Sequence, residues 1–249
     1  MSEVKINPWE RVDDLQLDGL RLIQNPNWFC FGVDAVLLSD FSAKSIKKGN
    51  RVLDLCTGNG IIPILLSSKS DAGEICGVEI LEPVAELAKR NVLMNCLEEK
   101  IKITADDLNN AVCIFGKGSF DNISCNPPYK ENKGGIKNAD DIITAARHEV
   151  FCTLEEIIDV SEKLLKPYGK LTMIHRPERL ADIICLMRER RIEPKRLRFV
   201  HPSPDKTATM ILIEGAKHQK PKLFLEPPLY IYDNEGNYSE EIERIYQRA

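Results

Sequence analysis

The sequence predicts an α/β fold built on a mostly parallel sheet of seven strands, with one antiparallel strand near the C-terminus. From residue 51 onwards, short apolar segments rich in β-forming residues alternate with segments of helical periodicity, which is typical of βαβ units. Near the C-terminus, only a short link with Pro202 and Pro204 separates the β-rich residues 196–201 from residues 208–213. This link is too short for a crossover helix, so these two strands should pair antiparallel.

The predicted elements follow this alternation in chain order. Strands are expected at residues 51–55, 75–80, 101–104, 122–125, 170–175, 196–201 and 208–213. Helices are expected at residues 61–68, 84–96 and 154–165. The last of these helices should end at Lys166, before Pro167 and Gly169. Two short β-like runs at residues 222–225 and 229–232 and an amphipathic tail at residues 240–246 are interpreted as structure at the edge of the sheet.

The composition is that of an ordinary globular protein, with 43% hydrophobic and 29% charged residues. No segment approaches the roughly 18 uninterrupted apolar residues of a membrane span, and residues 1–10 do not resemble a secretory signal. We therefore expect a cytoplasmic protein with a single domain over residues 1–249. Its core should be residues 51–215, between an N-terminal segment (1–50) and a C-terminal elaboration (216–249).

The spacing of the cysteines argues against a metal site or a disulfide framework. The eight cysteines lie singly in apolar stretches and none forms a CxxC pair, so we expect buried, reduced thiols. The four histidines are far apart in the chain. The sequence thus predicts no metal.

The net charge of −4 argues against a uniformly basic protein that binds nucleic acid. Phosphate binding depends on the local charge of a surface and not on the net charge of the protein, however. Residues 188–198 contain six basic side chains and only two glutamates. Taken alone, this segment is better explained as a solvated helix end.

The first predicted strand runs into a glycine-containing turn that opens a helix. Asp54 lies near the end of the strand, and Thr57, Gly58 and Gly60 follow in the turn. Such a turn lets the backbone approach a nucleotide-like ligand at the carboxyl edge of the sheet. A dinucleotide site would need a further glycine in the region where Pro63 stands. Asp54 would repel a pyrophosphate but suits the ammonium group of a methionine moiety, which favours S-adenosylmethionine over NAD.

Acidic residues also follow the next two strands. Glu79 ends the second strand, where a carboxylate can accept hydrogen bonds from both hydroxyls of a ribose. After the third strand, either Asp106 or Asp107 can accept from the amino group of the cofactor adenine, and Asp107 is preferred because Leu108 could pack on the base. Ile80, Leu108 and, after the next strand, Asn126 are also predicted to line the cofactor site. Each acid alone would be better explained as a loop residue or a helix cap, but acids at successive strand ends favour a cofactor site.

Asn126, Pro127, Pro128 and Tyr129 directly follow the fourth strand and should lie at the same edge of the sheet. A nitrogen conjugated to a ring or a carbonyl is a poor nucleophile because its lone pair is delocalised. Hydrogen bonds from that nitrogen to the Asn126 side-chain oxygen and the Pro127 carbonyl would strengthen as positive charge develops. The prolines keep the carbonyl rigid, and Tyr129 offers a face on which a planar substrate can stack. An ordinary proline turn could give the same four residues, but their place downstream of a cofactor turn indicates direct methyl transfer to a planar nitrogen.

These residues resemble the class I amino-methyltransferases with an [DN]PP[YF] motif, and among them the bacterial valine-tRNA adenine-N6 methyltransferases. The most specific matching segments are residues 31–38 (FGVDAVLL), 126–129 (NPPY) and 146–149 (ARHE). The resemblance implies a Rossmann-like fold, S-adenosylmethionine as methyl donor with S-adenosylhomocysteine as product, and an adenine of the tRNA anticodon loop as target. It also implies that residues 1–50 help to close over the cofactor, with Phe31 and Asp34 in the cofactor site. The family commonly has glycine where this chain has Cys56.

Basic residues are expected to meet the phosphates of the RNA. The candidates are Lys130, Lys133, Arg147, Arg190 and Arg191. A base in a loop can be splayed into a pocket more easily than a base in a duplex, and the segment before the first strand is too short for a sizeable extra recognition domain. The expected partner is therefore tRNA, with no membrane and no obligate protein partner.

Three alternatives stay open. Enzymes with the same motif methylate other planar nitrogens, in an rRNA base, a DNA adenine or a protein glutamine amide. A noncatalytic RNA-binding module could retain the cofactor pocket as a relic, although the intact residues 126–129 argue against it. A nucleotide-dependent dehydrogenase is disfavoured by the acidic first turn.

Overall fold

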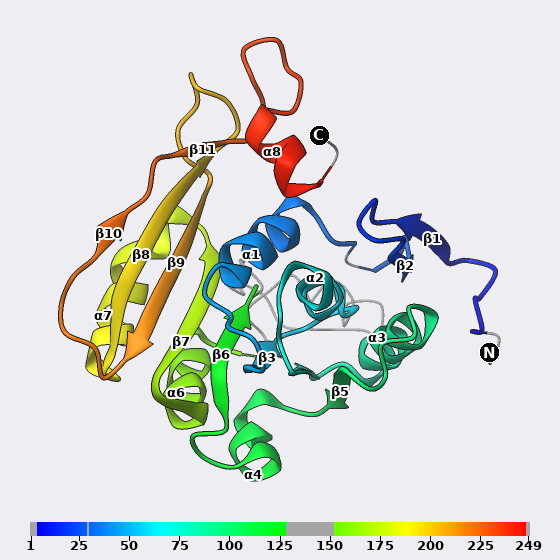
Figure 1. The fold of residues 1–249 in the computed structure, drawn as a ribbon, viewed down its shortest axis with the longest axis horizontal. Coiled ribbons are helices and arrows are strands. Elements are labelled where there is room, and N and C mark those ends of the chain that lie inside the picture. The colour runs from blue at the N-terminus through cyan, green and yellow to red at the C-terminus, as the bar shows by residue number, and fades with distance from the viewer. Residues whose placement is uncertain (1–3, 29, 128–151, 248–249) are drawn as a thin grey trace, which may run out of the picture.

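The computed structural model describes residues 4–28, 30–127 and 152–247 and shows a central β-sheet with helices on both faces (Figure 1). In these residues the sheet contains nine strands: β3 (Arg51–Leu55), β4 (Glu74–Glu79), β5 (Ile101–Ala105), β6 (Phe120–Cys125), β7 (Leu165–His175), β8 (Ile192–His201), β9 (Met210–Lys217), β10 (Phe224–Leu225) and β11 (Leu229–Tyr230). Their order is β10-β8-β9-β7-β6-β3-β4-β5, and β11 also pairs with β8. Among them β9 alone runs antiparallel to its neighbours, β7 and β8. The predicted fold class, with its antiparallel strand near the C-terminus, is confirmed.

Helices cover both faces of this sheet. The described helices are α1 (Val33–Ala43), α2 (Ile61–Lys69), α3 (Glu82–Met94), α4 (Ala111–Phe115), α6 (Leu154–Leu164), α7 (Leu180–Glu189) and α8 (Glu240–Ile245), with 3-10 turns at Leu108–Asn110 and Pro177–Arg179. In Figure 1, α1, α2 and α3 lie in front of the sheet, and α4, α6 and α7 lie behind it. In the part of the chain that the structure describes, no helix is both long and apolar enough to cross a membrane.

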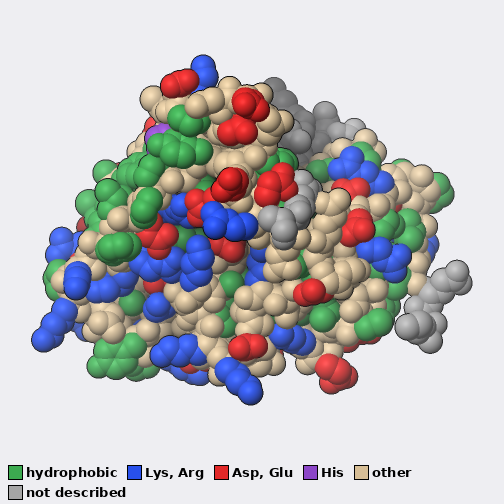
Figure 2. All heavy atoms as spheres, turned by 45° about the horizontal axis from the view of Figure 1, so that its top comes forward, with side chains coloured by type: hydrophobic (Ala, Val, Ile, Leu, Met, Phe, Trp, Pro, Cys, Tyr) green, Lys and Arg blue, Asp and Glu red, His purple; other side chains and the backbone are tan. Residues whose placement is uncertain are grey.

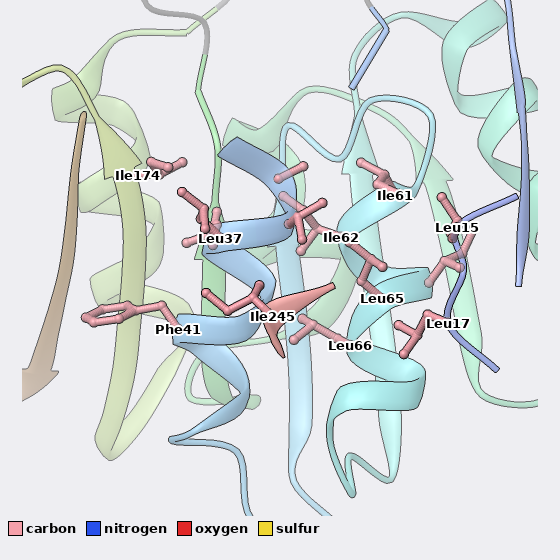
Figure 3. Close-up of a cluster of buried hydrophobic side chains, with 14 of the residues drawn as sticks. Leu15, Leu17, Leu37, Phe41, Ile61, Ile62, Leu65, Leu66, Ile174 and Ile245 are labelled. Carbon is pink, nitrogen blue, oxygen red and sulfur yellow. The ribbon is translucent and has the colours of Figure 1, made fainter. Parts of the chain in front are cut away.

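Two hydrophobic clusters hold the helices against the sheet. The front cluster contains Leu37 and Phe41 of α1 and Ile62 and Leu66 of α2, and the Phe41 ring points away from α2 (Figure 3). Ile245, from the C-terminal α8, packs into the same cluster. The second cluster lies behind the sheet and includes the buried side chains of α6. The C-terminal residues thus pack against α1, an element from the N-terminal part of the chain.

Strand periodicity decides which side chains face each cluster, because successive residues of a strand point to opposite faces. In β3, Val52 belongs to the front cluster, whereas Leu53 and Leu55 belong to the rear cluster. Asp54 therefore points to the front face, toward α1 and α2. The same alternation places Ser124 of β6 on the front face, directly beside Asp54 in the register of the two strands.

Most predicted elements are present, and several boundaries differ. The seven predicted strands correspond to β3–β9, and the two edge runs to β10 and β11. The sequence did not predict α4, α7 or the hairpin of β1 (Arg11–Asp14) and β2 (Arg21–Gln24). The predicted end of α6 at Lys166 is wrong, because the helix ends at Leu164 and β7 begins at Leu165. Pro167 cannot continue a helix, and Tyr168, with a φ of 66°, marks an irregular entry into β7.

Asn91 in α3 and Asn95 at the C-cap of this helix anchor the N-terminal hairpin. Asn95 accepts from the backbone N–H of Arg21 and donates to the carbonyl of the same residue. Asn91 does the same with Ile23, and its amide also donates to the carbonyl of Asn59 in the turn after β3. Asn91 is completely buried, so β2 and this turn are joined through one rigid side chain. The division into residues 1–50, 51–215 and 216–249 stays a prediction.

The cysteines are only partly as predicted. All eight are free thiols. Cys76, Cys125 and Cys152 are buried, whereas Cys96, Cys113 and Cys185 are exposed. The prediction of uniformly buried thiols is therefore wrong, because the exposed cysteines lie on or next to peripheral helices rather than on strands. Within the described residues, no group of three or more His, Cys, Asp or Glu side chains is placed to hold a metal ion.

Candidate active site

Four parallel strands bring the predicted polar residues to one edge of the sheet. Neighbouring strands lie in the order β5-β4-β3-β6, and their carboxyl ends carry Asp106, Glu79, Asp54 and Asn126. In open α/β sheets, ligands bind in the crevice outside the carboxyl ends of the strands. The sheet order therefore gathers acids that are distant in sequence around one possible ligand site.

The turn between β3 and α2 depends on unusual backbone conformations. Cys56 has a φ of 58° and Gly60 a φ of 83°, in the left-handed region that favours glycine. This chain thus forms the turn with a cysteine at a position where the backbone conformation favours glycine. Gly77, on the neighbouring β4, makes room for the turn, because a Cβ there would lie 2.9 Å from the Thr57 hydroxyl.

Asp54 is completely buried and incompletely hydrogen-bonded. Its Oδ1 accepts a hydrogen bond of 2.6 Å from the Ser124 hydroxyl. Its Oδ2 and the hydroxyl of Thr57 have no hydrogen-bond partner within the described residues. Burial raises the pKa of Asp54 to about 7, although the nearby hydroxyls of Ser124 and Thr57 both act in the opposite direction. Buried polar atoms are usually satisfied in folded proteins, so these two atoms suit the polar group of a ligand.

Glu79 is held in place by the backbone around it. Its Oε2 accepts from the N–H of Gly58 at 2.9 Å, and its Oε1 accepts from the N–H of Leu81 at 3.0 Å. Burial raises the pKa of Glu79, and these backbone hydrogen bonds oppose that effect. A carboxylate oxygen can accept more than one hydrogen bond. Glu79 can therefore fix the glycine turn and still accept from the hydroxyls of a ligand.

The two acids after β5 both have local structural roles. Asp106 accepts from the N–H of Asp107 and from the amide of Asn110. Asp107 caps the following 3-10 turn by accepting from the N–H of Asn109. Leu108 is buried in the rear cluster. These contacts do not decide which acid meets a cofactor, and the preference for Asp107 stays a prediction.

Asn126 meets α1 at the end of β6. Its side-chain nitrogen donates a hydrogen bond of 3.1 Å to Oδ2 of Asp34, in the first turn of α1. Asp34 and Pro127 are both buried. Phe31, just before the helix, packs against the front cluster, whereas Ile80 after β4 is 38% exposed. Asp34, predicted as a cofactor residue, thus touches the residue predicted to hold the reacting nitrogen.

Several predicted residues lie outside the described part of the chain. These are Pro128, Tyr129, Lys130, Lys133 and Arg147. Their roles in catalysis or substrate binding stay predictions.

The basic segment at residues 188–198 lies away from this edge and is largely paired with carboxylates. Arg190 and Arg191 stand at the amino end of β8, whereas Asn126 follows the carboxyl end of β6, which runs in the same direction. The Arg190 guanidinium contacts carboxylates of three residues, and Arg198 is buried against Glu241. Lys and Arg side chains gather on the left-hand side of Figure 2, where β8–β10 lie in Figure 1. Phosphate binding by Arg190 and Arg191 stays a prediction.

Sequence analysis missed two residues that shape the site. Ser124 holds the buried Asp54, and Asn91 ties the turn after β3 to β2. The signal for Ser124 is a polar residue in an apolar strand. It stands two positions before Asn126, so the alternation of side chains along a strand places both on the same face. For Asn91 the only signal is a polar residue on the apolar face of an amphipathic helix, and such a signal does not name its partner.

Comparisons with known proteins agree with this geometry. The family model described as methyltransferase small domain matches residues 20–186. A protein of Porphyromonas gingivalis named tRNA1(Val) (adenine(37)-N6)-methyltransferase is 31% identical over 222 residues, which cover 86% of each chain. Among solved structures, a predicted O-methyltransferase from Agrobacterium tumefaciens superposes with a TM-score of 0.69 at 19% identity, over 86% of this chain and 95% of the other. A geranyl diphosphate methyltransferase in complex with S-adenosylmethionine has a TM-score of 0.55 at 12% identity, over 74% and 84% of the two chains.

The fold and the site together define a Rossmann-like methyltransferase. The chain belongs to the methyltransferase small domain family, and further curated relatives share the name of the Porphyromonas gingivalis protein. The prediction of a class I methyltransferase is confirmed. The residues that bind the cofactor and the substrate stay proposals.

Proposed function

We propose that this enzyme transfers a methyl group from S-adenosylmethionine to the N6 amino group of an adenine in the anticodon loop of a tRNA. The observation that carries the proposal is the position of Asn126 and Pro127 at the carboxyl edge of the sheet, beside the strands that present Asp54 and Glu79. The names of the relatives support adenine 37 of valine tRNA as the target.

The residues at the carboxyl ends of β3 and β4, and the turn after β3, fit the cofactor. Oδ2 of Asp54 is a buried acceptor without a partner among the described residues, which suits the ammonium of the methionine moiety. Glu79 suits the ribose hydroxyls, because its carboxylate is fixed by two backbone N–H groups beside the glycine turn. The left-handed turn with Gly58 and Gly60 keeps side chains away from the ligand. When bound, the cofactor supplies a methyl group on a positively charged sulfur and leaves as S-adenosylhomocysteine.

Asn126 and Pro127 act on the accepting nitrogen. The Asn126 side-chain oxygen and the Pro127 carbonyl accept hydrogen bonds from the two N–H bonds of the exocyclic amine. These bonds draw the nitrogen out of conjugation with the ring and strengthen as it becomes positive, so they stabilise the transition state more than the ground state. Pro127 is buried, and its ring restricts the backbone that presents the carbonyl. Tyr129 would stack on the adenine, and no covalent enzyme intermediate is required.

The target adenine must leave the stacked anticodon loop to reach the pocket. A base in an anticodon loop is not held in a duplex, so it can be turned into the pocket at lower cost than a paired base. Lys130, Lys133 and Arg147 are proposed to contact the phosphates near that base. Arg190 and Arg191 stand at the opposite edge of the sheet, so phosphates that they bind must belong to a more distant part of the tRNA.

An experiment with labelled cofactor separates this function from its alternatives. The protein is incubated with labelled S-adenosylmethionine and with separate pools of RNA and protein from cells that lack it. Label in the tRNA fraction supports the proposal, label in a protein favours a glutamine amide, and label in rRNA or DNA favours another base. No transfer to any pool by the folded, cofactor-binding protein would instead favour the noncatalytic RNA-binding module.

A further inference from the structure

The contact between Asp34 and Asn126 joins two segments that are 92 residues apart in sequence. Asp34 is only 8% exposed, and its Oδ1 accepts from the backbone N–H of Ala35 at 2.9 Å. Its Oδ2 accepts from the side-chain nitrogen of Asn126. The backbone before the helix leaves space for this carboxylate, because a Cβ on Gly32 would lie 3.0 Å from Oδ1. The start of α1 is thus built to hold one carboxylate against the end of β6.

The chemistry of a carboxylate determines how the Asn126 amide is oriented. An ionised carboxylate only accepts hydrogen bonds, whereas an amide has a donating end and an accepting end. If the Asn126 amide rotated by half a turn, its oxygen would face the Asp34 oxygen and both would lack a proton. The first turn of a helix also favours a negative charge. The nitrogen end of Asn126 is therefore held toward Asp34, and the oxygen end is directed away from it.

We propose that Asp34 is a positioning residue that fixes the Asn126 amide with its oxygen toward the accepting nitrogen. This inference rests on the proposed function, because it assigns a purpose to the oxygen end of Asn126. It also narrows the substrate class. A site that presents an oxygen here accepts a group with N–H bonds, such as an exocyclic amine, and disfavours a carbonyl or a ring nitrogen without hydrogen. The role differs from direct cofactor binding, which the family resemblance implies for Asp34.

Steady-state kinetics on a tRNA transcript test this role. In Asp34→Asn the new amide can either donate or accept, so Asn126 is no longer held in one orientation. We expect kcat to fall about 10- to 100-fold, as for the loss of a hydrogen bond to a charged group, while the KM for tRNA and the calorimetric Kd for S-adenosylhomocysteine change less than about threefold. Asp40→Asn is the matched control, because Asp40 is on the same helix and pairs with Lys44. A loss of cofactor affinity in place of the fall in kcat would overturn the proposal.

A second variant distinguishes positioning from a general effect on folding. In an Asn126→Ala background, Asp34→Asn should cause almost no further loss of kcat, because its effect acts through Asn126. An equal loss in both backgrounds would overturn the proposal.

A spectroscopic measurement keeps this test independent of activity. The side-chain amide protons of Asn126 are assigned by selective asparagine labelling and by their absence in Asn126→Ala. They should shift in Asp34→Asn and stay in place in Asp40→Asn. If the wild type transfers no methyl group to tRNA, the proposed function fails, and this spectrum still decides whether Asp34 holds the Asn126 amide. Unshifted resonances in Asp34→Asn would show that it does not.

Discussion

Replacing Asp54 with asparagine should stabilise the free protein while it weakens cofactor binding. Asp54 is completely buried, and an asparagine can still accept the hydrogen bond from Ser124 through its oxygen. The substitution removes a negative charge whose burial is unfavourable. Among the described residues, no cation forms a hydrogen bond with this carboxylate. The same charge is the group proposed to pair with the cofactor ammonium. Stability and binding should therefore change in opposite directions.

The size of the effect follows from the pKa. Burial raises the pKa of Asp54 from 3.8 to about 7, and one pKa unit corresponds to about 1.4 kcal/mol, so the ionised carboxylate costs the folded state about 4 kcal/mol near pH 8. Because the folded-state pKa is the higher one, this cost is small below about pH 4 and grows as the pH rises toward about 7. Near pH 5.5 the cost is about 2 kcal/mol by the same relation.

Urea unfolding of the two proteins at both pH values measures the effect. Asp54→Asn should be more stable than the wild type by a few kcal/mol at about pH 8, and its advantage should shrink by about 2 kcal/mol at about pH 5.5. In calorimetry, the wild type should bind S-adenosylhomocysteine more weakly as the pH falls below about 7, because Asp54 becomes protonated. The variant should bind it about tenfold or more weakly than the wild type at about pH 8. An equal loss of stability at both pH values would show that the buried Asp54 carboxylate does not destabilise the folded protein.

Three further variants test other parts of the site and of the proposed RNA-binding surface. Asn126→Ala should lower the rate of methyl transfer by roughly 10²- to 10³-fold with little change in the calorimetric Kd for S-adenosylhomocysteine, and a loss confined to cofactor affinity would contradict its proposed role. Gly60→Ala should lower the free energy of unfolding in urea by about 1–2 kcal/mol, because the φ of Gly60 is 83° and the added Cβ would lie 3.2 Å from the Cβ of Ala88. An unchanged urea midpoint would argue against this left-handed conformation of Gly60. Charge reversal of both Arg190 and Arg191 to glutamate should weaken tRNA binding in a filter-binding titration and spare cofactor affinity, whereas unchanged tRNA affinity would exclude this surface.

Much of the site could be predicted because parallel strands place their ends at one edge. Asp54 and Glu79 lie at the carboxyl ends of apolar strands and Asn126 directly follows another, and the alternation of strands and helices is enough to predict that the strands run parallel. The residue types then indicate the chemistry. The local sequence pattern is therefore enough to predict both the parallel sheet and the acidic residues at its edge.

Contacts between distant segments could not be predicted in this way. Nothing near Asp34 in the sequence indicates that its carboxylate reaches Asn126, because the contact depends on how α1 packs across the front of the sheet. Arg190 is a similar case, since its partners Glu155 and Asp159 belong to the neighbouring α6. A count of charges along the chain finds a basic segment but does not show that acids from other elements neutralise it.

The identity of the methylated nucleoside is the decisive observation for the proposed reaction. Total tRNA from a strain that lacks this protein is methylated in vitro, digested to nucleosides and separated by chromatography with mass detection. We expect N6-methyladenosine with the wild type and almost none with Asn126→Ala. A methyl group on another base or another position of adenine, or an undiminished yield with Asn126→Ala, would contradict the proposed reaction.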